Sequence, residues 1–134
     1  MSDAPSGADV PVYAVRLSPA ASAQAVAEYD RLTQTADTEA AEDWREGLRA
    51  AWAGLARLPQ RCPVAPEDAA FQQFSPGPPL RVFLYRRGSR RSAWRLLFTI
   101  HEADAHDPAT VRVQHIRHSA QLPLSAWPAE DTEP

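Results

Sequence analysis

The chain has 134 residues, of which 44% are hydrophobic and 23% are charged, and its formal net charge at pH 7 is −3. This length predicts one domain with its own core, and the composition is that of an ordinary soluble protein. No apolar run is long enough to cross a bilayer and no N-terminal signal pattern is present, so we expect a cytoplasmic protein without a membrane partner. The lone cysteine, Cys62, excludes an intrachain disulfide and a thiolate metal site.

The charges are distributed unevenly along the chain. Residues 1–79 carry six arginines and eleven acidic residues, whereas residues 80–118 carry eight arginines and three acidic residues. Lysine is absent, and the planar guanidinium of arginine binds phosphate or carboxylate through two parallel hydrogen bonds. The arginine-rich region therefore suits a phosphate-rich or acidic partner.

The first third of the chain predicts a strand followed by a helix. Residues 1–11 are small and polar and are expected to be disordered, whereas residues 12–17 alternate as in a strand. Ser18 followed by Pro19 is typical of a helix start, because the hydroxyl caps the helix and proline fits its first turn. This helix is expected to run to about Thr33.

A second helix is expected to begin after a cap at Asp37 or Thr38 and to end before Leu58 and Pro59. Its apolar residues recur at spacings of three and four and predict one buried stripe. The stripe consists of Ala41, Trp44, Leu48, Trp52 and Leu55. We interpret its two tryptophans as core residues rather than as a base-stacking platform.

The second half predicts a loop and three strands. Residues 59–79 contain six prolines and are expected to form a loop. Alternation predicts strands at 80–85, 94–100 and 111–118, with a histidine-bearing acidic turn at 101–108. The fold class is therefore α+β: an N-terminal strand, a two-helix hairpin and a three-stranded antiparallel meander form one four-stranded sheet covered on one face.

Strand alternation also divides each strand into two faces. We expect the more apolar faces, led by Trp94 and Phe98, to turn toward the helices. In the last strand, Val111 and Val113 share one face and Ile116 lies on the other. The residues left on the open face of the sheet are then Arg81, Tyr85, Arg95, Arg112, Gln114 and His118.

Four segments, taken in order, resemble a known family. They are Tyr-Ala-Val-Arg-Leu-Ser-Pro-Ala-Ala at 13–21, Trp-Arg-x-x-Leu at 44–48, Trp-Arg-Leu-Leu-Phe-Thr-Ile at 94–100 and Val-Gln-His-Ile-Arg-His-Ser-Ala at 113–120. Together they resemble RelE/ParE-type toxins of bacterial type II toxin–antitoxin pairs. The resemblance covers residues 12–121 and leaves 122–134 as an acidic, proline-containing tail, where Leu122, Leu124 and Trp127 are candidates to dock on the domain.

The resemblance implies a cognate antitoxin that wraps the toxin, and one of two targets. RelE-like members cut mRNA on the ribosome with basic side chains of the open sheet face, whereas ParE-like members act on DNA gyrase. Arg81 and Arg95 match basic positions of the RelE-like branch. The basic residue expected after the last strand is Gln121 here, and residues 122–134 contain no counterpart of that branch's catalytic tyrosine.

Cleavage of RNA without a metal needs cations on the phosphate and a group that moves protons. The candidate catalytic residues are therefore Arg81, Arg95 and His118, because histidine is the side chain best suited to moving protons near neutral pH. The candidate residues for binding nucleic acid or a partner are Arg86, Arg87, Arg90, Arg91, Arg112 and Arg117. The arginines of the 86–91 turn are equally explained as a solvated turn whose charge discourages edge-to-edge association.

No cofactor or metal is expected, because His115 and His118 point to opposite faces of a strand and no glycine-rich phosphate loop is present. Two functions remain open from the sequence. The first is a toxin that inhibits growth through translation-linked mRNA cleavage or through DNA gyrase. The second is a catalytically decayed member of the family that only binds a protein or RNA.

Overall fold

The computed structural model describes residues 12–86, 93–118, 124 and 127–128. The elements in chain order are β1 (Ala14–Leu17), α2 (Pro19–Thr35), α3 (Thr38–Leu55), a 3-10 turn (Pro59–Arg61), α4 (Asp68–Phe74), β2 (Arg81–Arg86), β3 (Ala93–His101) and β4 (Thr110–His118). This order confirms the predicted α+β layout. The predictions for residues 1–11, for the tip of the hairpin and for most of the tail lie outside the described residues.

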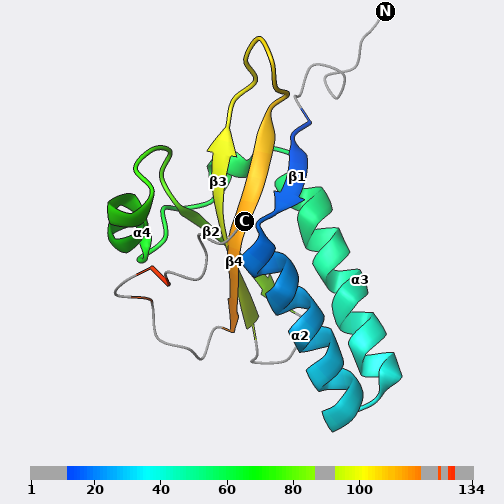
Figure 1. Cartoon of the computed structure of the whole chain (residues 1–134). Coiled ribbons are helices and arrows are strands. Elements are labelled where there is room, and N and C mark those ends of the chain that lie inside the picture. The colour runs from blue at the N-terminus through cyan, green and yellow to red at the C-terminus, as the bar shows by residue number, and fades with distance from the viewer. Residues whose placement is uncertain (1–11, 87–92, 119–123, 125–126, 129–134) are drawn as a thin grey trace, which may run out of the picture.

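The strands form one mixed sheet in the order β1-β4-β3-β2. The pairs β2–β3 and β3–β4 are antiparallel as predicted, and β1 lies parallel to β4 at the far edge. Helices α2 and α3 pack side by side on one face of the sheet, and α4 lies on the other side (Figure 1). We call these the helix-covered face and the second face.

Both long helices begin where the sequence predicts. Ser18 caps α2, because its Oγ accepts a hydrogen bond from the backbone N–H of Ala21 at 3.0 Å. The same hydroxyl donates to the carbonyl of Gln114 in β4 at 2.8 Å, and Ser18 is almost fully buried. Asp37 caps α3 in an exposed position by accepting from the N–H of Ala40 at 2.7 Å.

Replacing Ser18 with alanine should therefore lower the free energy of unfolding by about 1–2 kcal/mol, because one buried hydroxyl both caps α2 and joins it to β4. The matched control is Asp37→Ala, which removes only an exposed cap and should cost about 0.5–1 kcal/mol. Urea denaturation of the two variants measures both values. An equal loss in both would contradict a second role for the Ser18 hydroxyl.

The main core lies between the helix-covered face and the two long helices. Its buried members are Tyr13, Ala21, Trp44, Leu48, Ala51, Leu55, Tyr85, Leu96, Phe98, Val111, Val113 and Ile116. The Trp44 ring packs edge-on against the Trp94 ring, with 5.7 Å between their centroids. Trp44 is 3% exposed and Trp52 packs at the margin of the same cluster, so both are confirmed as core residues.

A second, smaller core covers part of the second face, which strand alternation predicts to be open. It is formed by Ala65, Phe71, Leu80, Leu97 and Trp127. Phe71 comes from α4, which lies inside the segment predicted as a loop. Trp127 comes from the tail, and its ring packs edge-on against that of Phe71 at 4.9 Å. The tail thus contributes a buried aromatic to the domain.

The predicted orientation of β2 is wrong. In the observed register Tyr85 lies opposite Trp94 and Arg81 lies opposite Phe98, so both point to the helix-covered face. The Tyr85 hydroxyl donates to the carbonyl of Trp44 at 2.9 Å and is buried. The apolar side chain of Val82 turns instead to the second core.

The predicted alternation of β4 is wrong at its centre. Leu97 pairs with His115 but Phe98 pairs with Val113, so Gln114 is an extra residue in a β-bulge. The bulge resets the alternation and lets Val113 and Ile116 both enter the main core. His118 consequently lies on the helix-covered face, not on the open face.

Candidate functional site

Arg95 lies on the second face and forms a buried bidentate ion pair with Glu67, next to the start of α4. Its Nη1 and Nη2 donate to the two carboxylate oxygens at 2.5 and 2.7 Å. Arg95 is 9% exposed and Glu67 is 0% exposed. Burial alone would raise the pKa of Glu67, but hydrogen bonds from Arg95 and from backbone N–H groups hold it below its usual value. The guanidinium of Arg95 is thus occupied inside the protein.

Arg81 lies on the opposite face, on the edge strand β2. Its Nη1 donates to the carbonyl of Cys62 at 2.7 Å and, more weakly, to that of Gln60 at 3.5 Å. The Arg81 side chain therefore connects the segment after α3 to the sheet through hydrogen bonds. Because Arg81 and Arg95 occupy opposite faces, the structure does not bring them together at one phosphate.

His118, the third candidate catalytic residue, lies at the end of β4. Its ring packs edge-on against Trp94 at 4.8 Å between centroids. Arg81 pairs with Phe98, four residues further along β3 from Trp94, so about 13 Å of strand separates the two candidates on this face. The three predicted catalytic residues therefore do not converge.

The arginines predicted to bind nucleic acid or a partner differ in their exposure. Arg117 lies opposite Arg95 across β3 and β4, and burial lowers its pKa although nearby Glu67 opposes the shift. Arg112 is exposed on the second face of β4. Arg86 ends β2 and its side chain lies outside the described residues, as do Arg87, Arg90 and Arg91.

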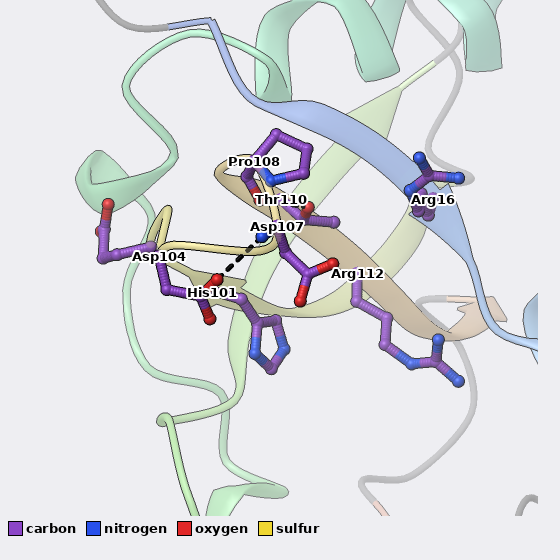
Figure 2. Close-up of a pocket in the computed structure, with 8 residues that line it drawn as sticks. Arg16, His101, Asp104, Asp107, Pro108, Thr110 and Arg112 are labelled. Atoms are coloured by element: carbon purple, nitrogen blue, oxygen red, sulfur yellow. Dashed lines mark hydrogen bonds between the residues drawn. The ribbon is translucent and has the colours of Figure 1, made fainter.

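A polar cavity of about 410 Å³ lies where β3 turns into β4, beside β1 (Figure 2). Its lining residues are Arg16, His101, Glu102, Asp104, Asp107, Pro108, Thr110 and Arg112. Its volume falls in the range of about 300–1,000 Å³ that small-molecule sites occupy. This polar cavity is the candidate functional site that the geometry provides.

The cations of the polar cavity come from a row across three strands of the second face. Arg16 in β1 and Thr99 in β3 both pair with Arg112 in β4, so the three side chains leave the sheet on the same side. Figure 2 shows Arg112 beside His101 and Asp107, with Arg16 on the neighbouring strand. In the described part of the chain, neither Arg16 nor Arg112 has an ion-pair partner.

His101 belongs to a short hydrogen-bond chain next to these arginines. Its Nε2 lies 2.8 Å from the Thr99 hydroxyl, which accepts a hydrogen bond from Gln114 Nε2 at 3.1 Å. Partial burial lowers the pKa of His101, and the charge of Arg112 lowers it further. The lowered pKa favours the neutral form of His101, which offers a hydrogen bond rather than a charge.

The three acidic residues that line the polar cavity differ in their hydrogen-bond partners. Glu102 accepts hydrogen bonds from the Tyr13 hydroxyl at 3.0 and 3.2 Å. Asp104 accepts from the backbone N–H groups of His106 and Asp107 at 2.7 and 2.8 Å, which lowers its pKa. Across the described ranges, the Asp107 carboxylate itself has no hydrogen-bond partner.

Sequence reasoning identified only Arg112 among these cavity residues. Arg16 and His101 were missed, because Arg16 comes from the first strand and only the parallel pairing of β1 with β4 places it beside Arg112. The sequence does indicate that these polar residues lie exposed on strands. It does not indicate which strands are neighbours in the sheet, and therefore which residues lie side by side.

Within residues 12–86 and 93–118 and the described part of the tail, no group of three or more His, Cys, Asp and Glu side chains is arranged to hold a metal ion. None of the helices in the same ranges combines the length and apolar character that a bilayer crossing requires. Neither a protein-family model nor a curated protein sequence matches this chain.

Proposed function

We propose that this chain is the toxin of a RelE/ParE-type toxin–antitoxin pair, that it acts in the cytoplasm, and that a cognate antitoxin neutralises it. Two observations support the proposal: the four segments that resemble the family, and an α+β layout that agrees with the layout this resemblance predicts. The same layout leaves Arg16 and Arg112 exposed on the sheet and acidic residues such as Glu39 and Glu46 exposed on α3 for contacts with a protein partner.

We further propose that growth inhibition proceeds through DNA gyrase and not through RNA cleavage. The observation that carries this choice is the dispersal of the candidate catalytic residues. In-line cleavage of RNA needs a proton-transfer group and cations within hydrogen-bond reach of one phosphate. Here Arg95 is paired with Glu67, Arg81 is bound to carbonyls on the opposite face, and His118 packs on Trp94.

Induction of this chain alone in bacteria should arrest growth, with DNA damage and with intact transcripts. Growth curves, an assay for DNA breaks and primer extension on abundant mRNAs measure the three outcomes. Arg81→Ala should remain toxic, because this partly exposed side chain has a structural contact and no role in cleavage. A short open reading frame beside the gene that encodes a DNA-binding protein would be the candidate antitoxin, and its co-expression should restore growth.

Three results would count against this proposal. Codon-phased cuts in mRNA would replace gyrase with the ribosome as the target. Loss of toxicity in soluble, folded Arg81→Ala would show that Arg81 takes part in the toxic activity. Normal growth at confirmed soluble expression would remove the toxin function and favour the second candidate, a module that only binds a protein or RNA.

A further inference from the structure

The outer edge of β2 is paired over only part of its length. β2 is the last strand in the sheet order, so one of its two edges faces away from the sheet. The segment before α4 covers the start of this edge, where the N–H of Ala65 donates to the carbonyl of Leu80 at 2.8 Å. The N–H of Val82 donates to the carbonyl of Pro63 at 3.0 Å. Proline has no N–H with which to return this bond, so the pairing ends at Pro63.

Beyond Pro63, the backbone of β2 presents hydrogen-bonding groups to the outside. Because the N–H of Val82 points outward, strand alternation also turns the N–H and carbonyl groups of Leu84 and Arg86 outward. The residue between these two, Tyr85, turns its backbone groups toward Trp94 in β3 instead. Among the described residues, none donates to or accepts from the outward groups of Leu84. Unpaired edge groups of this kind are a template for an added strand.

A largely apolar groove of about 570 Å³ lies beside this edge, and we call it the edge groove. Its walls include the apolar residues Pro63, Pro66, Val82 and Leu84 and two arginines, Arg61 and Arg95. Leu84 is 52% exposed, although an exposed apolar residue on an open edge favours association. The edge groove therefore offers apolar contacts next to unpaired backbone groups.

The charge of the edge groove is positive. No acidic side chain of the described residues lines it, and the charge of Arg95 is already neutralised by Glu67. Arg61 is exposed and has no ion-pair partner in the described ranges. A strand that carries carboxylates would therefore find a free guanidinium on the groove wall.

The same charge argues against a second copy of this chain as the occupant. β2 begins with Arg81 and ends with Arg86. Two copies joined edge to edge would bring two arginine-bearing strands together, and like charges on facing strands destabilise a sheet. An acidic partner is the complementary choice.

We propose that the free edge of β2 binds an extended, acidic segment of a partner protein by strand addition. The segment runs antiparallel to β2 and exchanges main-chain hydrogen bonds with Leu84 and Arg86. Every second side chain of the segment is apolar and packs in the edge groove against Val82 and Leu84, and a carboxylate between them pairs with Arg61. Main-chain bonds supply the affinity in this mode of recognition, and the alternating side chains supply the selectivity.

This inference is independent of the proposed toxin function. It rests on the backbone groups of β2 and on Arg61, none of which is a candidate for catalysis. Its test is a binding measurement on the isolated chain, which does not depend on growth inhibition or on the target of a toxin.

The experiment is fluorescence anisotropy of a labelled, terminally blocked peptide of about ten residues in which glutamate and valine alternate, titrated with the full chain at low ionic strength. The peptide should bind with a Kd of about 100 µM, as expected for a small, transient interface. A peptide of alternating lysine and valine should bind at least about 10-fold more weakly, because its charge repels Arg61. A single-stranded oligouridylate should not compete, because it has no peptide N–H groups to pair with β2.

Two methylated peptides test the main-chain bonds without any change to the protein. Side chains directly opposite each other share a face, so the valine opposite Leu84 lies in the edge groove and directs its N–H at the carbonyl of Leu84. N-methylation of the valines removes these donors and should weaken binding at least about 10-fold. N-methylation of the glutamates alters only the far edge of the added strand and should leave the Kd within about 2-fold of that of the parent peptide.

Variants of the chain assign the contacts from the other side. Leu84→Pro removes an outward N–H, which an edge strand tolerates, and should weaken binding at least about 10-fold. Leu84→Ala keeps that N–H and loses only the groove contact, so it should weaken binding about 3-fold. Arg61→Gln should weaken it by about 5-fold. The matched control is Arg112→Gln, which changes an exposed arginine of β4 outside the edge groove and should bind as the wild type does.

Circular dichroism of each variant checks that it is folded, and the methylated peptides decide the outcome if Leu84→Pro is not. The proposal is overturned if the two methylated peptides bind equally well, because no strand is then added. Tighter binding of the lysine peptide or of the oligouridylate would assign the edge to a different class of partner and overturn it equally. So would a dimer in sedimentation equilibrium that folded Leu84→Pro converts to a monomer, because the edge would then belong to a second copy.

Discussion

Replacing Glu67 with alanine should lower the free energy of unfolding by about 3–5 kcal/mol, because it leaves the buried guanidinium of Arg95 without its counter-charge. The two side chains are 0% and 9% exposed, and both carboxylate oxygens accept hydrogen bonds from Arg95. Water cannot replace a partner at this depth. Urea denaturation monitored by tryptophan fluorescence measures the loss.

Two further variants test whether the loss of stability comes from the unpaired buried charge or from the removed side-chain volume. Glu46→Ala breaks an ion pair with Arg49 on the surface of α3, where both side chains are more than half exposed, and should change stability by only about 0–0.5 kcal/mol. Glu67→Leu combined with Arg95→Met replaces the buried pair with apolar side chains and should recover most of the loss. A cost for Glu67→Ala no greater than that for Glu46→Ala would show that the buried pair is not formed.

The same pair predicts the direction of the pH dependence. The pKa of Glu67 is lower in the folded protein than its usual value of 4.5 in an unfolded chain. The folded state therefore holds this proton less tightly, so the stabilisation is complete above about pH 4.5 and is lost as the pH falls through the lower folded pKa. The stability of the wild type should decrease more steeply on acidification than that of Glu67→Gln.

The helices and their starts could be predicted because their signals are local. Ser18, Pro19 and Asp37 fall at the positions where the backbone N–H groups of a first turn need acceptors. The apolar stripe from Ala41 to Leu55 lies on the face that contacts the sheet, and all but Trp52 of its members are buried.

The faces of the strands could be predicted only in part, because alternation gives two sets of residues and does not say which set points inward. In β2 the set with Arg81 and Tyr85 has fewer aliphatic residues, yet it faces the main core, where the Tyr85 hydroxyl donates to the carbonyl of Trp44. In β4 the extra residue Gln114 shifts the alternation, and no period-two pattern predicts such a bulge.

The second core explains why the candidate site is the polar cavity and not the surface around Arg95 that the sequence predicts. Helix α4 has seven residues between prolines, too few to show a helical period, and it carries both Phe71 and the cap residue Glu67. Once α4 and Trp127 cover the β2 side of the second face, Arg95 becomes an internal residue. On the β1 side of this face, the exposed arginines among the described residues are Arg16 and Arg112.

Replacing Gly47 with alanine should lower the free energy of unfolding by about 2 kcal/mol, even though alanine is the better helix former by about 1 kcal/mol. A Cβ atom at Gly47 would lie 2.0 Å from the hydroxyl oxygen of Tyr85 and 2.6 Å from its Cζ. Tyr85 is 5% exposed and its hydroxyl donates to the carbonyl of Trp44, so the ring cannot move without losing that bond.

The chain offers a matched control on the same helix. A Cβ atom at Gly54 would meet no atom within 4 Å, so Gly54→Ala should raise the free energy of unfolding by about 0.5 kcal/mol through helix propensity alone. Tyr85→Phe in the Gly47→Ala background removes the nearest clashing atom and should recover part of the loss. Because one substitution is made at two sites of α3, opposite signs in urea denaturation isolate the contact with Tyr85. Equal stabilisation by both would show that α3 does not press its backbone onto the Tyr85 ring.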